Sequence, residues 1–449
     1  MNTLVFERSP VRFAASRLAS TLGSGRGAPV GPLRLVDGEA PELPGPDWYR
    51  VVPRLAGICG SDLSTLDGRS SRYFEAIVSF PFVPGHEVVG TVAERAVAAD
   101  GRVLAPGARV VIEPVLGCVA RGLEPRCPAC AEGRTGDCEH LTLGHLRPGL
   151  QTGFCTDTGG GWSSLGLVAH TSQLHAVPDQ LSDADAVMVE PLACAVHAAL
   201  AARAGADDVV AVLGAGTLGL LVTASLEQLG RAGLAATPAA LLVGARYAHQ
   251  RRWATELGAT SAVDPDQLAR AVRRRTGSLT VGGPSGGGRL SGGADVVIDC
   301  VGSAESIGRC LAMVRPRGRV VLVGMPGRVH VDLAPLWHRE VALVGAYAYG
   351  TELVAATGNG SAARVPRRTF DLALDMAGAT AIGRLVSATY PLDRFEEALA
   401  HAGAAGRRGA VKVAFDLSAE SPRAERPPPT AHHRPGPTRR SAARKGRGA

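Results

Sequence analysis

Short apolar runs alternate with glycine and proline through the first part of the chain. Between residues 30 and 180 these runs include YRVVPRLAGICG (49–60), FVPGHEVVGTVAE (82–94) and ARVVIEPVLGC (108–118). Frequent turn residues between runs of this length indicate short strands. We therefore predict a mostly β, barrel-like domain. TLVFER (3–8), near the start of the chain, is predicted separately to be a first strand.

The pattern changes at about residue 183. From there, alanine-rich helical stretches alternate with short apolar runs: DVVAVLGAG (208–216), AALLVGAR (239–246), DVVIDCVG (295–302) and GRVVLVGM (318–325). This alternation is typical of βαβ units and a parallel sheet. The glycine-rich segment 277–293 is predicted to be a mobile surface insertion.

Four segments follow from these patterns. We predict a β domain over residues 1–190, a parallel-sheet domain over 191–347, a return to the β domain over 348–416 and a tail over 417–449. The tail has almost nothing to bury, so we expect it to be disordered. It also holds seven Arg and one Lys against two Glu, so it carries +6 of the net charge of +7. The folded body is close to neutral, which argues against nucleic acid as its main partner.

The nine cysteines do not suit a secreted disulfide framework, because a chain of 449 residues has ample material for an apolar core. A cluster at 118–138 suits metal ligands, which implies a reducing compartment, and we expect a cytoplasmic protein. No signal peptide is indicated. The uncharged stretch 209–226 approaches the length of a membrane span, but its glycines favour a strand, a turn and a helix.

VLGAGTLG (212–219) contains the spacing G-x-G-x-x-G at Gly214, Gly216 and Gly219. The motif follows a predicted strand and opens a predicted helix, which is the context of a dinucleotide site. The glycines permit the tight turn, the approach to a pyrophosphate and the packing of helix on strand. Free N–H groups at the start of the helix, around Thr217 and Leu218, would bind the phosphates.

The next predicted strand lacks the acidic residue that binds the ribose 2′-hydroxyl of NAD. Gly244 stands at its end, Arg246 follows two residues later, and Arg251 and Arg252 lie behind. Guanidinium groups suit a dianionic 2′-phosphate. We predict NADP as the cofactor, with Arg246 as the main contact and Arg251 beside it. The alternative is NAD, with these arginines on a solvated helix face.

CPACAEGRTGDC (127–138) holds Cys127, Cys130 and Cys138 in the spacing C-x2-C-x7-C. A tetrahedral structural zinc needs a fourth ligand. Cys118 lies upstream, and loop closure costs only slowly more as a loop lengthens. We predict a four-thiolate site made of these cysteines. The alternatives are Glu124 as an oxygen ligand, with Cys118 free, and four thiols without a metal.

Three further segments supply a thiolate, an imidazole and a carboxylate. Cys59 occurs in GICGSD (57–62), His86 and Glu87 in PGHEVVG (84–90), and Glu190 in VEPLACAVHA (189–198). Together these groups suit a zinc ion that keeps an open fourth position. Cys194, close in sequence to Glu190, leaves the third ligand open.

These motifs, in this order from about Val51 to Phe415, resemble the zinc-dependent alcohol dehydrogenases of the medium-chain dehydrogenase/reductase family. The sorbitol, threonine and glucose dehydrogenase branch is the more similar one. The resemblance implies an α/β fold, with a Rossmann domain (a doubly wound parallel sheet) and a mostly β, GroES-like barrel catalytic domain. It also implies reversible hydride transfer between a nicotinamide and an alcohol, such as a polyol, a sugar or a secondary-metabolite alcohol. A homodimer or homotetramer is expected.

The resemblance places Cys59, His86 and Glu190 round a catalytic zinc, with Glu190 bound directly or through water. Glu190 is favoured over Cys194 because it matches the motif position. Glu87 is expected to enter or leave the metal shell, and Asp62 to hold His86 or the local loop.

Ser61 is expected to pass the hydroxyl proton outward. The chain departs from the family at Glu124, where the lobe normally has its first Cys, and at Ser64, where some relatives extend the proton path with a His. It also has Gly60 where other branches have an Arg or His that helps to hold pyrophosphate.

Two other functions compete with this interpretation. A zinc-independent quinone or enone reductase of the same superfamily would lack the three ligands of the catalytic zinc. A nucleic-acid-binding protein would use the cysteine lobe and the basic tail. The segment GFCTDTGGGWSS (153–164) is expected to be a substrate-side loop, although Cys155 also suits a simple packed thiol.

Overall fold

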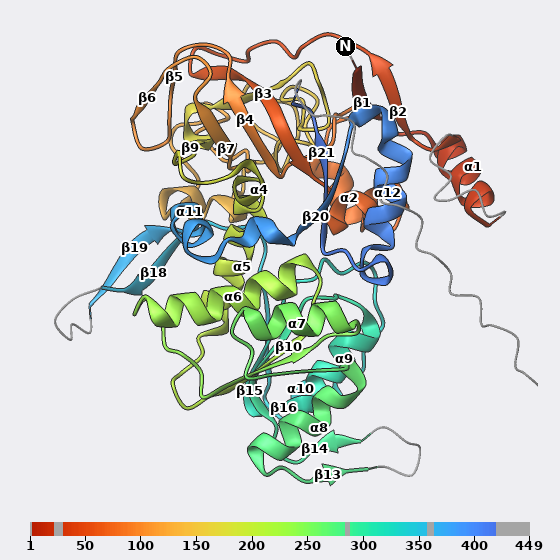
Figure 1. Ribbon diagram of the computed structural model, residues 1–449, viewed down its shortest axis with the longest axis vertical. Coiled ribbons are helices and arrows are strands. Elements are labelled where there is room, and N and C mark those ends of the chain that lie inside the picture. Colours follow the sequence, from red (N-terminus) through yellow and green to blue (C-terminus); the bar gives the residue numbers. More distant parts are fainter. Residues whose placement is uncertain (1, 22–29, 283–287, 357–362, 419–449) are drawn as a thin grey trace, which may run out of the picture. The chain divides into compact units, whose positions relative to one another are not determined.

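A six-stranded parallel sheet forms between residues 209 and 345, as the alternating pattern predicted. The computed structural model describes residues 2–21, 30–282, 288–356 and 363–418 (Figure 1). In spatial order the strands are β12 (Ser261–Val263), β11 (Ala240–Gly244), β10 (Val209–Leu213), β15 (Ala294–Asp299), β16 (Val314–Leu322) and β17 (Ala342–Gly345). Numbered along the chain, this order is 3-2-1-4-5-6, the order of a Rossmann fold.

Both faces of the central strands of this sheet are buried. Val210 and Val212 of β10 belong to an apolar core with α5 (Val189–Ala202) and α6 (Thr217–Arg231), while Ala211 and Leu213 belong to a second core with α8 (Pro265–Thr276) and α9 (Ala304–Met313). Continuous apolar strands are expected where helices cover both faces. Strand order reverses at β10, between β11 and β15, which is where such sheets bind ligands.

The other large sheet is mostly antiparallel and joins segments from both ends of the chain. Its order is β20 (Val386–Tyr390), β21 (Lys412–Asp416), β3 (Trp48–Gly57), β4 (Val88–Val92), β7 (Arg109–Ile112) and β9 (Leu174–Ala176), and β8 (Leu167–His170) also pairs with β3. Ala414 of β21 lies opposite Gly57 of β3. The predicted fold class, a Rossmann sheet with a mostly β domain, is confirmed.

Shorter elements complete the described residues. The strands are β1 (Asn2–Phe6), β2 (Leu33–Asp37), β5 (Ala96–Val97), β6 (Val103–Leu104), β13 (Thr280–Val281), β14 (Arg289–Leu290), β18 (Thr351–Ala355) and β19 (Arg364–Arg368). The helices are α1 (Pro10–Thr21), α2 (Gly60–Leu66), α3 (Pro128–Ala131), α4 (Asp183–Ala186), α7 (Ala248–Glu256), α10 (Ala334–His338), α11 (Thr369–Thr380) and α12 (Phe395–Gly403).

Several local predictions can be compared with these elements. The first strand, β1, is confirmed, and residues 209–226 form a strand, a turn and a helix as predicted. Helix α1 and the β18–β19 hairpin were not predicted. The glycine-rich insertion carries a small antiparallel pair, β13 with β14, and Leu290 in it is buried; its residues 283–287 lie outside the described part. The predicted tail lies outside the described residues from 419 onward. Among the helices that are described, none is long and apolar enough to cross a membrane.

A buried polar cluster joins the β domain to α11. His175 of β9 lies 3.0 Å from Glu113 through Nε2 and 3.3 Å from Asp371 through Nδ1, and Arg368 contacts Glu113 at 2.6 Å. Burial works to lower the pKa of His175, but the two carboxylates outweigh it and raise that pKa. The cluster therefore favours a protonated imidazole.

Candidate active site

Cys59, Asp62 and His86 form the centre of the site. Cys59 follows β3 and precedes α2, and its N–H donates to Asp62 Oδ2 at 2.9 Å. Asp62 Oδ1 lies 3.4 Å from His86 Nδ1, and both side chains are buried. Burial works to lower the pKa of His86, but Asp62 and Cys59 outweigh it and raise that pKa. Asp62 thus lies where its carboxylate attracts and restrains the imidazole of His86.

Glu87 lies beside His86 and pairs with a buried lysine that no sequence motif marks. The carboxylate of Glu87 contacts Nζ of Lys412, from β21, and each side chain is only 2% exposed. Burial works to lower the pKa of Lys412, but Glu87 outweighs it and raises that pKa. A lone lysine in the apolar strand AVKVAF was the available signal, because a buried lysine needs a partner.

Glu190 lies in the first turn of α5 and is buried. Burial raises the pKa of Glu190 to about 7, and the charge of Glu87 adds to the effect while His86 opposes it. Cys194, one helical turn later, donates its thiol to Glu190 Oε1 at 3.6 Å. The two groups left open as third ligand therefore contact one another. Ser61 is partly exposed on α2.

Thiolate, imidazole and carboxylate come together as the donor set for zinc requires. The ligand atoms of Cys59, His86 and Glu87 all lie within 4.8 Å of one another, and Glu190 is not in that group. Among the described residues, Nδ1 of His86 also has no hydrogen-bond partner of normal geometry. These residues fit a metal ion. Direct ligation by Glu190 stays a prediction, and the carboxylate that the structure brings to the cluster is that of Glu87.

The four cysteines of the lobe converge as the spacing predicted. Cys118, Cys127, Cys130 and Cys138 are buried, and their sulfur atoms lie within 4.8 Å of one another. Main-chain N–H groups donate to three of these sulfurs, at 3.4 Å each. Hydrogen bonding from Cys130 lowers the pKa of the Cys138 thiol to about 5. Four buried thiols, three of which accept main-chain hydrogen bonds and one of which is easily deprotonated, are suited to bind a metal ion with tetrahedral geometry.

The long first loop of the lobe is held by a buried arginine. Arg121 is 0% exposed, and its guanidinium donates to main-chain carbonyls, at 2.6 Å for Gly149 and 3.0 Å for Leu116. Glu124, the alternative oxygen ligand, is instead exposed and pairs with Arg126 at 3.3 Å. The structure places Cys118, and not Glu124, with the other three thiols.

The glycine turn has the geometry that a dinucleotide site needs. Gly214 has a φ of +99°, and a Cβ on Gly219 would lie 1.8 Å from the carbonyl oxygen of Gly214. Gly216 precedes α6 without any side-chain cap, so the first N–H groups of α6, from Thr217 and Leu218, stay open for phosphate. Thr217 Oγ1 donates to the carbonyl of Val411 at 3.2 Å.

After β11, the two arginines predicted to bind a 2′-phosphate differ in their hydrogen bonding. Arg251 donates to the carbonyls of Ala245 and Arg246, both at 2.9 Å, so its guanidinium closes the turn. Arg246 is exposed and has no side-chain partner among the described residues. Gly244 ends the strand without a carboxylate, as the sequence indicated.

The loop 153–164 packs against the turn that carries His86. A Cβ on Gly160 would lie 2.1 Å from the carbonyl oxygen of Val83, and Trp162 Nε1 donates to Gly57 at 3.2 Å. Phe154 lies 5.8 Å from the His86 ring, centroid to centroid. Cys155 is a buried thiol whose pKa is raised by burial.

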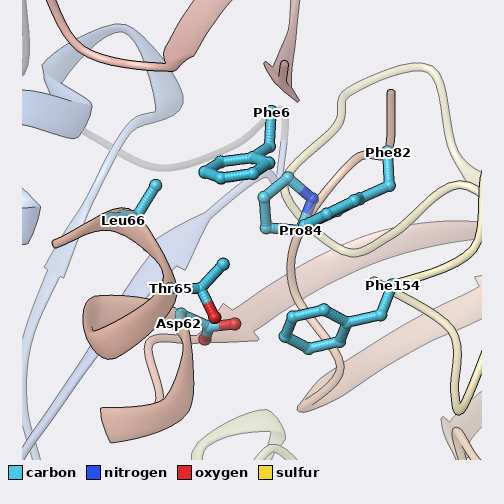
Figure 2. A pocket seen from close by; sticks show the side chains of 7 residues that line it. All are labelled: Phe6, Asp62, Thr65, Leu66, Phe82, Pro84 and Phe154. Atoms are coloured by element: carbon cyan, nitrogen blue, oxygen red, sulfur yellow. The ribbon is translucent and has the colours of Figure 1, made fainter. Parts of the chain in front are cut away.

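Figure 2 shows Phe154 with Phe6 and Phe82 round a small apolar pocket beside Asp62. The surrounding rings keep the Asp62 carboxylate in a low-dielectric environment, which strengthens its hydrogen bond from the Cys59 N–H and its attraction to His86.

Two family profiles match the chain. "Alcohol dehydrogenase GroES-like domain" matches residues 45–179, and "Zinc-binding dehydrogenase" matches residues 232–358. A sorbitol dehydrogenase of Arabidopsis thaliana is 30% identical over 68% of this chain and 75% of its own length. An L-idonate 5-dehydrogenase of Vitis vinifera is 28% identical over 68% of this chain and 74% of its own length.

Solved structures agree with these matches. A candidate zinc-binding dehydrogenase from Sinorhizobium meliloti 1021, bound to NADP, has a TM-score of 0.61 and 28% identity, over 86% of this chain and 95% of that chain. An alcohol dehydrogenase of Thermus sp. ATN1 shares the fold, with a TM-score of 0.64 and 24% identity, over 93% of this chain and 100% of that chain. The chain belongs to the zinc-dependent alcohol dehydrogenases of the medium-chain dehydrogenase/reductase family, and it is an alcohol oxidoreductase.

Proposed function

We propose that the protein transfers a hydride between an alcohol of the polyol class and NADP(H), with zinc at the Cys59–His86–Glu87 cluster. One observation supports this most directly. Val411 and Lys412 are consecutive, and they contact the start of α6 and Glu87 respectively. The phosphate-binding turn and the metal-binding cluster therefore lie on either side of one strand end, so cofactor and substrate can meet there.

When bound, zinc supplies Lewis-acid chemistry that stabilises an alkoxide. Cys59, His86 and Glu87 or Glu190 would hold it. Asp62, whose Oδ1 lies 3.4 Å from Nδ1 of His86, would help to hold the imidazole in place beside the metal.

Ser61 is proposed to accept the hydroxyl proton and pass it to water or the ribose. Glu190, with a pKa raised to about 7, can hold a proton beside the same site near neutral pH.

NADP is proposed over NAD for two reasons. β11 ends at Gly244 without the carboxylate that would bind a ribose hydroxyl, and Arg246 is free to contact a phosphate. The Sinorhizobium meliloti relative, 28% identical, is bound to NADP.

The second zinc is proposed at the four buried thiols, where it would contribute stability and no chemistry. Curated relatives named for sorbitol, idonate and xylulose motivate the polyol class of substrate. A cytoplasmic homodimer or homotetramer is proposed with it.

The test is the absorbance of reduced nicotinamide with zinc-loaded protein. Polyols, simple alcohols, sugars and their carbonyl products would be offered with NADP(H) and NAD(H) side by side. Turnover of a polyol with NADP supports the proposal. Turnover of enones by protein freed of metal would instead indicate the zinc-independent reductase, and absence of any nicotinamide binding would contradict both.

A further inference from the structure

The turn before β21 lies beside the segment that follows β11. This turn, η7 (Ala405–Arg408), packs on the ring of Tyr247, the residue that follows Arg246. A Cβ on Gly406 would lie only 2.3 Å from Cε2 of Tyr247, so the backbone of the turn rests directly on the ring. In a Rossmann fold, the end of the second strand is where the adenosine ribose binds. Residues 405–408 therefore border the position of the 2′-substituent.

Two arginines of this turn are free. Arg407 and Arg408 follow Gly406 directly, and both are exposed. In the part of the chain that the structure describes, neither they nor Arg246 form an ion pair with a carboxylate, whereas many other arginines of the protein do. Exposed guanidinium groups without an acidic partner are available to bind an anion.

We propose that Arg407 and Arg408 complete, with Arg246, a site for the 2′-phosphate of NADP(H). This inference rests on the proposed use of NADP(H). A 2′-phosphate carries a double negative charge and three acceptor oxygens, and the planar guanidinium can bind such a group through two parallel hydrogen bonds. One arginine comes from the β11–α7 turn and two come from the segment that leads into β21, so the phosphate is held between two parts of the chain distant in sequence.

The same segment continues to the other end of the site. From Gly406 it runs to Val411, whose carbonyl accepts a hydrogen bond from Thr217 at the start of α6. The next residue, Lys412, pairs with Glu87. A phosphate bound at Arg407 and Arg408 would fix the first part of a segment whose last part contacts the metal-binding cluster. NADPH should therefore protect the amides of 405–412 from hydrogen exchange more than NADH does.

The experiment compares the full chain with four variants. Dissociation constants for NADPH and NADH are measured from nicotinamide fluorescence at one fixed ionic strength. Arg246→Gln, the pair R407Q/R408Q, and Arg274→Gln, an exposed arginine of α8 as the matched control, are used. We expect R407Q/R408Q to weaken NADPH binding by about tenfold or more and NADH binding by less than about twofold. R407K/R408K should retain part of the preference for NADPH over NADH, because lysine keeps the positive charge but cannot form the two parallel hydrogen bonds of a guanidinium.

The outcomes separate the two claims. In one outcome, the full chain prefers NADPH, R246Q abolishes that preference and R407Q/R408Q leaves it intact. In that case the role of Arg407 and Arg408 in the 2′-phosphate site is refuted and the proposed cofactor stands. If the unaltered chain binds NADH as tightly as NADPH, the proposed cofactor is itself wrong. Equal loss of NADPH and NADH binding in R407Q/R408Q would also refute this role of Arg407 and Arg408, because it would indicate a general effect on nicotinamide binding.

Discussion

Replacing Lys412 with Met should destabilise the protein strongly. Lys412 and Glu87 are each 2% exposed and pair with one another. Methionine has a similar length but no ammonium group, so K412M would leave the Glu87 carboxylate buried without its partner. Removing one member of a buried ion pair costs about 3–5 kcal/mol. We expect the free energy of unfolding to fall by that amount in protein freed of metal by a chelator.

The assay is denaturant unfolding followed by tryptophan fluorescence. Trp162 packs on Phe415 of β21 at 5.2 Å between ring centroids, so its environment reports on the docking of that strand. The double variant E87Q/K412M is the control. It has neither charge, and we expect it to recover most of the lost stability, since the penalty lies in the unpaired carboxylate. The reasoning is refuted if K412M is as stable as the original protein, or if the double variant is no more stable than K412M.

Three further outcomes are expected. Cys118→Ser should lose the zinc of the lobe while Glu124→Gln keeps it, which metal analysis of the purified proteins would decide; equal zinc content in both would contradict the four-thiolate site. Because the two carboxylates raise the pKa of His175, its stabilising contribution is complete below the ordinary value of about 6.5 and is lost as the pH rises through the raised value. The unfolding temperature should therefore fall with pH in that range, and His175→Gln should flatten the fall; an unchanged pH profile would speak against it. Gly219→Ala should weaken nicotinamide binding at least about tenfold, because its methyl group would clash with the carbonyl of Gly214; titration of NADPH fluorescence measures it, and unaltered affinity would mean that the turn can relax.

Much of the fold could be predicted because its signals are local. Each strand of the parallel sheet carries its own apolar run, and the glycine turn is read within eight residues, Val212 to Gly219. Helix α1 and the hairpin β18–β19 carry no such signal. Strand β19, RVPRR, is mostly polar, and it is a strand because it pairs with β18 and not because of its own sequence.

The site was predictable to the extent that its residues lie in motifs. Cys59, His86 and the four lobe cysteines were identified by type and spacing. Lys412 was not identified. Its partner, Glu87, lies directly before β4, and the two residues meet only because β21 pairs with β3. The third ligand, a carboxylate, was also difficult to predict from the sequence. The motif position favoured Glu190, whereas the fold brings Glu87 to Cys59 and His86.

The pairing of β3 with β21 also has a consequence for synthesis of the protein. β3 is made early, but the strand that pairs with its residues 55–57 is made after the whole parallel sheet. Until residues 412–416 leave the ribosome, this end of β3 presents unpaired N–H and C=O groups, and an unpaired edge of this kind promotes aggregation. Contacts between such distant segments also slow folding, because a long loop must close first. The nascent β domain should therefore depend on chaperones until its last strand arrives, and messages that end before codon 412 should yield insoluble product.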